Sequence, residues 1–296
     1  MNPREVKIRL RGVRKTRQIT RAMKMVAAVK LRHAQAALAN ARPYAERMRA
    51  LAAALFAGIA PARDEHPFFS PRPVENILFV VVASDRGLCG SMNANVFRQA
   101  LRAAGDFEAE NGAAKGPAIH FFLIGRKARD FFRAQRNARP DAACRVREEV
   151  NFAGINAVQL GRRCCDFYRR GEFDRIEFFY NETPSGLQHY PARAALFPLD
   201  VARMKKDIPV AGDIILEPPG PDMLDAVINA YVAGEVRNIL MEAEVAEHAA
   251  RMLMMDLATK NADDLIAEMQ MAMNKLRQRL ITNELADITT GAEAVG

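Results

Sequence analysis

The chain has 296 residues, of which 50% are apolar and 26% are charged, so its composition is that of an ordinary globular protein and excludes a wholly disordered chain. The longest nearly unbroken apolar run, Ile77 to Ala83, is far short of the roughly 20 residues that cross a bilayer. No apolar signal-peptide core follows the basic N-terminus. The four cysteines (Cys89, Cys144, Cys164 and Cys165) include no Cys-x-x-Cys pair, so we expect a reducing compartment.

The net charge of +8 is distributed unevenly along the chain. Residues 1–49 contain 14 basic and two acidic residues, a net charge of +12, whereas the other 247 residues contain 29 basic and 33 acidic residues, a net charge of −4. A basic segment of this density suits nucleic acid or an acidic membrane. Charge alone therefore keeps a nucleic-acid-binding function open.

A long helix is predicted from Pro3 to about residue 59. Ala, Leu, Met, Arg, Lys and Gln dominate this segment, and all are good helix formers. At about 1.5 Å per residue the helix is roughly 85 Å long, with Pro43 as a point where it can kink. Prolines between residues 61 and 73 end the helix and form a linker. The expected packing positions are Val6, Leu10, Val13, Ala22, Met23, Val26, Val29, Leu51 and Leu55.

The middle of the chain, residues 75–200, alternates between buried strands and helices. Strands are expected at Ile77–Ala83, Ile119–Ile124 and Ile176–Tyr180, and helices near 92–104, 126–136 and 156–170. This alternation predicts βαβ units and a sheet covered on both faces. The expected fold of this region is a Rossmann-like α/β domain.

A second long helix is predicted from Asp222 to about residue 288, roughly 100 Å in length. Leu265, Met269, Met273, Leu276 and Leu280 step by three or four residues, close to the spacing of a coiled-coil seam. The methionines of this helix suit either an adaptable surface or the core of a helix pair. They are Met252, Met254, Met255, Met269, Met271 and Met273.

The two long helices are expected to pair with each other, because most helical stability comes from packing an apolar face. An antiparallel pair that starts near residues 58 and 221 gives paired residue numbers that add to about 279. This register lays the acidic stretch 235–268 beside residues 44–11 of the basic segment. Exposed ion pairs of this kind contribute only about 0 to 1 kcal/mol each, so they set the register more than the stability. About 18 residues beyond 277 would have no partner helix.

The chain is therefore expected to divide into four parts. These are an N-terminal helix (1–60), a linker (61–74), an α/β domain (75–217), and a C-terminal helix with its tip (218–296).

The segment Ser84–Asn93 follows a buried strand and opens a helix, a place where α/β folds often bind phosphates. It matches neither of the common glycine-rich phosphate-binding patterns, so a tight turn that needs Gly87 and Gly90 is the alternative interpretation. Asp85 could act as a lone catalytic acid, although capping of the turn is the simpler role. No His-x-x-x-His pair or Gly-x-Ser-x-Gly elbow is present.

Two functions therefore stay open on these grounds. The first is a nucleic-acid-binding coiled coil that uses the basic N-terminal helix, which contains only Tyr44 as an aromatic residue before Phe56. The second is a small-molecule α/β enzyme that uses the loop Ser84–Asn93.

Three motifs, in the same order along the chain, resemble the gamma subunit of F-type ATP synthases. The first is Thr16–Ala28 (TRQITRAMKMVAA), and the second is Ser84–Asn95 (SDRGLCGSMNAN), which includes Ser84, Asp85, Arg86, Gly87, Gly90 and Asn93. The third comprises Glu247–Met252 (EHAARM), Asn274–Gln278 (NKLRQ) and Ile281–Leu285 (ITNEL). The motifs span nearly the whole chain, so we expect membership of this family.

The resemblance implies a rotor subunit that binds no nucleotide, carries no cofactor and is not catalytic. Its long helices would form a shaft inside a ring of three alpha and three beta subunits. Its α/β domain would lie on the membrane c-ring beside the epsilon subunit, on the cytoplasmic side of a bacterial membrane. Nucleic acid is not an expected partner.

The resemblance also implies roles for particular residues. Arg277 and Gln278 would make polar contacts to a beta-subunit loop near the top of the shaft. Arg17, Arg21, Met23 and Lys24 would contact the acidic C-terminal lobe of beta. Residues 279–294 would form a tip that turns in an apolar sleeve.

Overall fold

The computed structural model describes residues 3–58, 66–70, 72–111, 117–138, 145–184, 188–200 and 221–293. The chain forms two compact units. The terminal unit comprises Met1–Val29 with Arg251–Gly296, and the central unit comprises Lys30–Ala250. The four-part division expected from the sequence stays a prediction, and much of its linker and its boundary at 217/218 lie outside the described residues.

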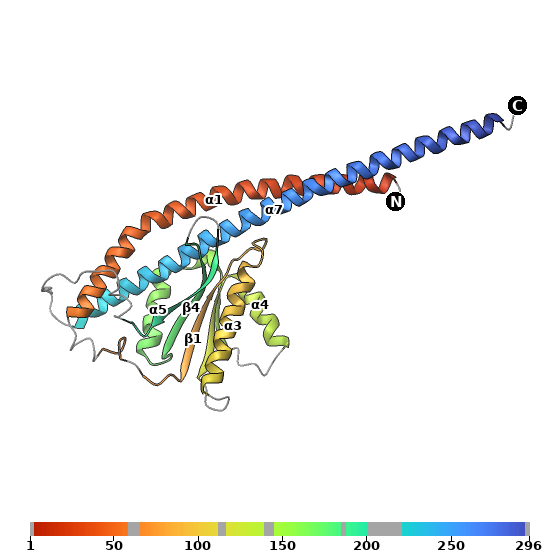
Figure 1. The fold of residues 1–296 in the computed structure, drawn as a ribbon. Helices are drawn as coiled ribbons and strands as arrows, with labels where there is room; N and C mark the ends of the chain where they lie inside the picture. The colour runs from red at the N-terminus through yellow and green to blue at the C-terminus, as the bar shows by residue number, and fades with distance from the viewer. Residues whose placement is uncertain are drawn as a thin grey trace. The chain divides into compact units, whose positions relative to one another are not determined.

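Two long helices are present, as predicted. Helix α1 runs from Pro3 to Gly58 and contains Pro43, and helix α7 runs from Pro221 to Glu293 (Figure 1). They have 56 and 73 residues. Within each unit the two helices are antiparallel neighbours, so the predicted helix pair is confirmed.

The register of the pair in the terminal unit matches the sequence estimate. Arg17 Nη1 lies 2.9 Å from Asp263 Oδ1, and Lys24 Nζ lies 2.6 Å from Asp256 Oδ1. Between them the Oγ1 atoms of Thr20 and Thr259 are 2.8 Å apart and share a hydrogen bond. The residue numbers of these pairs add to 279 or 280. Acidic side chains of α7 therefore do neutralise part of the basic segment.

The packing face of α1 agrees with the expected one at Val6, Leu10 and Leu55, which are buried, and differs from it elsewhere. Val26 and Val29 are 58% and 54% exposed, whereas Ala27 is 2% exposed. The buried positions follow a heptad repeat in steps of four and three, because the two helices pack as a coiled coil. Within α1 these buried positions are Val6, Leu10, Thr20, Ala27, Leu31, Ala34 and Leu38, and the expected Leu51 is half exposed.

The seam of α7 agrees with the expected one at Met269, Met273 and Leu276, which are half-buried and continue the heptad steps of the buried residues, and differs from it at the other two positions. Met255, Ala262 and Ile266 are buried, whereas Leu265 and Leu280 are 44% and 46% exposed. The methionines divide between the two roles weighed from the sequence, because Met255 packs in the seam and Met271 is 66% exposed.

The central unit contains a five-stranded sheet in the order β3-β2-β1-β4-β5. The strands are β1 (Asn76–Val82), β2 (Ala118–Ile124), β3 (Arg145–Val150), β4 (Arg175–Glu182) and β5 (Tyr190–Phe197). Strand β1 pairs in parallel with β2 and β4, β2 pairs in parallel with β3, and β5 is an antiparallel edge strand. The topology is that of a doubly wound α/β domain with one antiparallel edge.

Helices cover both faces of the sheet, as the apolar strands predicted. The helices of the domain are α3 (Met92–Asn111), α4 (Arg126–Ala138), α5 (Ala157–Arg169) and the short η1 (Phe152–Gly154). One face packs against α3 and α4, through residues such as Phe97 and Phe132. The opposite face packs against α5, the end of α1 and the start of α7, through residues such as Tyr168, Phe56 and Ile228. The long helices of the central unit are therefore part of its core.

We predict that helices α5 and α7 tolerate no added methyl group where they cross. A Cβ atom at Gly161 would lie 3.0 Å from the Ala233 Cα atom and 3.2 Å from its nitrogen, and backbone atoms yield little. Gly161→Ala should therefore lower the free energy of unfolding by about 1–3 kcal/mol. Thermal unfolding of the purified chain measures the effect.

Gly105→Ala, inside α3, is the matched control. A Cβ atom there meets nothing within 4 Å, so this change should raise the stability by about 0.5–1 kcal/mol. Equal melting temperatures of the two variants would show that α5 and α7 can move apart without a loss of stability.

Candidate functional site

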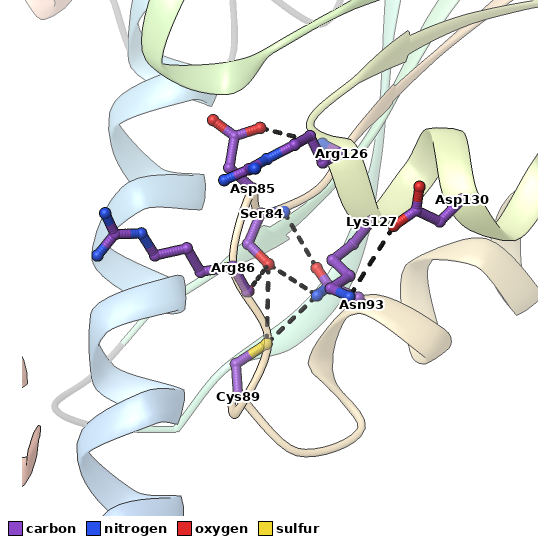
Figure 2. A network of polar contacts seen from close by, with 8 residues as sticks. All are labelled: Ser84, Asp85, Arg86, Cys89, Asn93, Arg126, Lys127 and Asp130. Carbon is purple, nitrogen blue, oxygen red and sulfur yellow. Dashed lines mark hydrogen bonds and ion pairs between the residues drawn. The ribbon is translucent and has the colours of Figure 1, made fainter.

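The segment Ser84–Asn93, the motif loop, joins β1 to the start of α3 and is held by a closed set of hydrogen bonds (Figure 2). The Ser84 backbone N–H donates to Asn93 Oδ1 over 3.2 Å, and Asn93 Nδ2 donates to Ser84 Oγ over 2.8 Å and to Cys89 Sγ over 3.2 Å. Ser84 Oγ donates in turn to the Arg86 carbonyl oxygen over 2.7 Å. Ser84 and Asn93 are buried. Their polar atoms are therefore used to shape the loop.

Asp85 ties this loop to two other segments. Its Oδ1 atom accepts the backbone N–H groups of Arg126 and Phe152, over 3.0 and 3.2 Å, and its Oδ2 atom accepts that of Ala153 over 3.1 Å. Burial opposes ionisation of Asp85, but the three N–H donors and the charge of Arg126 outweigh it and lower the pKa of the carboxyl. Asp85 therefore caps the start of α4 and anchors η1, which is the capping role weighed from the sequence.

The expected need for glycine in this loop holds at one of the two positions. Gly90 has φ of 62°, in the left-handed region that favours glycine. A Cβ atom at Gly87 would make only an ordinary contact, 3.6 Å from Lys127 Cε, so space does not require glycine there. The second left-handed residue of the loop is Leu88, with φ of 66°.

The loop lies at the carboxyl ends of β1 and β4, where the strand order reverses and doubly wound folds hold their ligands. Here Cys89 and Met92 pack against Ala246 and Ala250 of α7, and all four side chains are buried. Asn181, at the end of β4, donates to the Met92 carbonyl oxygen over 3.4 Å. The crevice is thus covered by the chain's own helix, and the geometry favours a structural loop over a substrate site.

The described part of the chain gives little support for a metal-binding site or a reactive cysteine thiol. No group of three or more His, Cys, Asp or Glu residues there could hold a metal ion. Cys89, Cys164 and Cys165 are buried free thiols. Burial raises the pKa of Cys164 and raises that of Cys165 to about 12, so both stay protonated. Cys144 lies outside the described residues.

The predicted contact residues of α1 lie close together in the terminal unit. Arg17 and Lys24 are paired with Asp263 and Asp256, and both sit at seam positions of the heptad repeat. Arg21 is exposed and Met23 is half-buried. Arg17 and Lys24 therefore have a partner inside the chain, which the sequence estimate of the register foresaw.

Arg277 and Gln278 lie elsewhere in the same unit. Both are exposed on α7, and the Gln278 carbonyl oxygen accepts the Thr282 hydroxyl over 2.9 Å. By helical rise Arg277 is roughly 30 Å along α7 from Asp256, the partner of Lys24. The structure therefore places the two sets of predicted contact residues at separate levels of the helix pair.

The terminal unit exposes many large apolar side chains on its surface. The sequence analysis expected some of them to pack between the helices and did not predict the others as a surface feature. On α1 they follow the face opposite the heptad seam, so a search for a 3.5-residue repeat would have separated them from the core. They are Ile8, Ile19, Met25, Val26 and Val29 of α1, and Leu257, Leu265, Met271, Leu280, Ile281 and Leu285 of α7.

Comparison with known proteins decides the family. Residues 2–295 match the family model described as ATP synthase. The ATP synthase gamma chain of Moorella thermoacetica is 36% identical over 294 residues, which cover 99% of this chain and 98% of that protein. The chain belongs to the ATP synthase gamma-chain family. The gamma chain of Anaeromyxobacter dehalogenans is 38% identical, with 99% of each chain covered.

Solved structures show the same fold. A chain of the Euglena gracilis mitochondrial ATP synthase, solved with OSCP, F1 and the c-ring, has a TM-score of 0.65 at 19% identity and covers 99% of this chain and 94% of its own length. A chain of the Tetrahymena thermophila mitochondrial ATP synthase central stalk and c-ring has a TM-score of 0.58 at 22% identity, with 81% and 99% covered.

Family membership confirms the resemblance drawn from the three motifs. A gamma chain is a non-catalytic rotor subunit in the central stalk of an ATP synthase complex. Among the described residues, no helix is both long enough and apolar enough to cross a membrane.

We predict that Asp85→Asn destabilises the central unit in a pH-dependent way. The pKa of Asp85 is lower in the folded than in the unfolded chain, so the carboxylate stabilises the fold at neutral pH. This contribution disappears as pH falls from about 4, the unfolded value, through the lower folded pKa. Asp85→Asn should cost about 1–3 kcal/mol at pH 7 and progressively less below pH of about 4.

Denaturant unfolding at several pH values checks this prediction. Asp106→Asn, at an exposed position of α3, is the control and should change stability little at any pH. A cost for Asp85→Asn that does not depend on pH would show that the carboxylate charge is not what holds α4 and η1.

Proposed function

We propose that the chain couples ion-driven rotation of a membrane c-ring to conformational cycling of catalytic beta subunits, for ATP synthesis or for ATP-driven ion pumping. Three alpha and three beta subunits surround the terminal unit, and the central unit lies on the c-ring beside epsilon. The complex is held on the cytoplasmic side of a bacterial cell membrane. The chain supplies no catalytic group and binds no nucleotide or nucleic acid.

The observation that carries this proposal is the paired helices of the terminal unit, in a chain that belongs to the gamma family. Their outer surface keeps about a dozen large apolar side chains in water, such as Ile8 (67% exposed) and Met271 (66% exposed). Past the level of the first described residues of α1, the continuation of α7 has no partner helix among the described residues of this unit. A surface of this kind is stable in a cell when other subunits cover it.

The mechanism requires contacts that differ between the conformations of the beta subunits. A rotor biases a site only when its interaction free energy differs between that site's open and closed states. Arg277 and Gln278 supply polar groups at one level of the helix pair, and Arg17, Arg21, Met23 and Lys24 supply mainly basic groups at another. One rotation of the helix pair would present each set to the three beta subunits in turn.

We predict that Arg277→Ala combined with Gln278→Ala lowers coupled ATP synthesis by about tenfold, since loss of one charge-assisted hydrogen bond costs about 1.5 kcal/mol. Both side chains are exposed, so the isolated chain should keep its helical content and melting temperature. ATP synthesis by the complex reconstituted in vesicles measures the effect. Lys275→Ala, on an exposed neighbour, is the control, and unchanged turnover of the double variant would contradict this role.

We predict that exchanging the two charges of the Arg17–Asp263 pair distinguishes two roles of these residues. One role is to set the register of the helix pair, and the other is to contact beta. Arg17→Asp with Asp263→Arg keeps an ion pair worth at most about 1 kcal/mol, so the isolated chain should unfold at nearly the same temperature. The sign of the charge on α1 is reversed, so coupled synthesis should fall severalfold if Arg17 faces the acidic lobe of beta.

The matched control exchanges a partly exposed pair in the central unit. Arg147→Glu with Glu172→Arg should leave both stability and synthesis nearly unchanged. If the variant with the Arg17/Asp263 exchange keeps full activity, these residues only set the register of the helix pair and do not contact beta.

A further inference from the structure

A hollow of about 410 Å³ lies between α1 and α7 in the terminal unit. Three basic side chains of α1 line it on one side, and two amide side chains of α7 line it on the other. These polar residues are Lys7, Arg11, Arg14, Gln270 and Asn274. The apolar side chains of Leu10 and Met273 complete the described lining, which contains no acidic side chain. The hollow is therefore strongly positive.

The three basic side chains lie on one side of α1, because they are spaced four and three residues apart. Helical rise separates Lys7 from Arg14 by roughly 10 Å, and long side chains from both ends can converge on a point between them. Like charges at this spacing repel each other and destabilise a helix. An anion bound in the hollow would remove this repulsion.

Acidic residues of the chain neutralise α1 elsewhere but not here. Arg17 and Lys24, further along α1, form ion pairs with acidic side chains of α7. None of the three basic residues of the hollow forms an ion pair or a side-chain hydrogen bond with any residue that the structure describes. After Glu268, the sequence of α7 has no acidic residue before Glu284. The positive charge of the hollow is thus left for an external anion.

The polar groups of the hollow match a phosphate group. Phosphate carries close to two negative charges near pH 7 and presents several strong acceptor oxygens. A guanidinium group donates two parallel N–H bonds to such oxygens, and a lysine ammonium adds a point charge. The amide groups of Gln270 and Asn274 are further donors, and neither is used in a side-chain hydrogen bond within the described part of the chain. A single carboxylate, with one charge and two oxygens, would match fewer of these groups.

We propose that this hollow binds inorganic phosphate and that the anion bridges α1 and α7. Arg11 and Arg14 would supply charge-assisted hydrogen bonds from one helix, and Asn274 would donate from the other. The described lining has no aromatic side chain to stack on a base and no carboxylate to hold Mg²⁺, so the free anion fits better than a nucleotide. The proposal goes beyond the rotor function and does not depend on it.

Equilibrium dialysis of the purified full-length chain against radiolabelled inorganic phosphate tests this proposal. Sodium chloride keeps the ionic strength constant, so general screening of the basic helix does not vary during the titration. The expected result is one phosphate bound per chain, with a dissociation constant near or below about 1 mM. Because the anion binds the folded chain, the melting temperature should rise with phosphate at this constant ionic strength.

Two double variants that lose the same charge distinguish the hollow from the rest of the basic helix. Arg11→Gln with Arg14→Gln should weaken binding at least about tenfold, because charge-assisted hydrogen bonds are lost. Arg9→Gln with Lys15→Gln removes two exposed charges of the same helix outside the lining, and should weaken binding less than about twofold. Circular dichroism checks that both variants keep their helical content.

Asn274→Leu, a change of similar volume, tests the bridge between the helices and should weaken binding by about threefold, since one neutral donor is lost. The proposal is overturned by the absence of saturable binding, by equal losses in the two double variants, or by an affinity that Asn274→Leu does not change. It is equally overturned if MgATP displaces phosphate at an equal concentration. Binding is measured on the free chain and ATP synthesis on the reconstituted complex, so failure of this proposal is distinguishable from failure of the rotor function.

Discussion

The heptad seam between α1 and α7 is the constraint on which the rest of the structure depends. A helix of 56 or 73 residues obtains most of its stability from packing, and the seam supplies that packing within each unit. In the terminal unit the seam is made of residues such as Leu10, Ala27 and Ile266. Because it uses only one stripe of each helix, the outer faces are left for other subunits.

The central unit uses the same two helices in another way. Phe56 of α1 and Ile228 of α7 are buried in the core that covers one face of the sheet, so the helices are part of the domain rather than attached to it. The motif loop completes this arrangement, because Cys89 and Met92 seat α7 at the carboxyl ends of the strands. A loop at a position where α/β folds often bind phosphates is thus used to hold a helix, and Ser84, Asp85 and Asn93 maintain the shape of the loop.

Much of this architecture was predictable from the sequence because it depends on patterns that a single chain displays. The long runs without glycine or proline predicted α1 and α7, and the apolar runs predicted β1, β2 and β4. Strand β3 was missed because it is an edge strand whose charged side chains alternate with partly buried ones. Strand β5 was missed because it contains Pro191 and alanines instead of β-branched residues. Both strands depend on pairing with a neighbour more than on their own composition.

The candidate site was predictable to a smaller extent. The register followed from the lengths of the two helices, and the Arg17–Asp263 and Lys24–Asp256 pairs agree with it. The packing face did not follow, since Val26 and Val29 fit a helical period as well as Ala27 does, and only the partner helix decides between them. The partners of Asp85 could not be foreseen, because Arg126, Phe152 and Ala153 approach it only after the sheet has formed.

The hydrogen bond between Thr20 and Thr259 has a mechanical consequence for the helix pair. A slide of α7 by one heptad would place Ile266 or Met252 opposite the Thr20 hydroxyl, and neither side chain can replace the lost partner. The slide that places Ile266 there also replaces Asp263 by Gln270 opposite Arg17, so the hydrogen bond and this ion pair are lost together. The opposite slide brings Asp256 to Arg17 but takes it away from Lys24. Apolar seams of alanine and leucine resist bending but distinguish poorly between registers one heptad apart. The threonine pair therefore fixes the register of the two helices along their common axis.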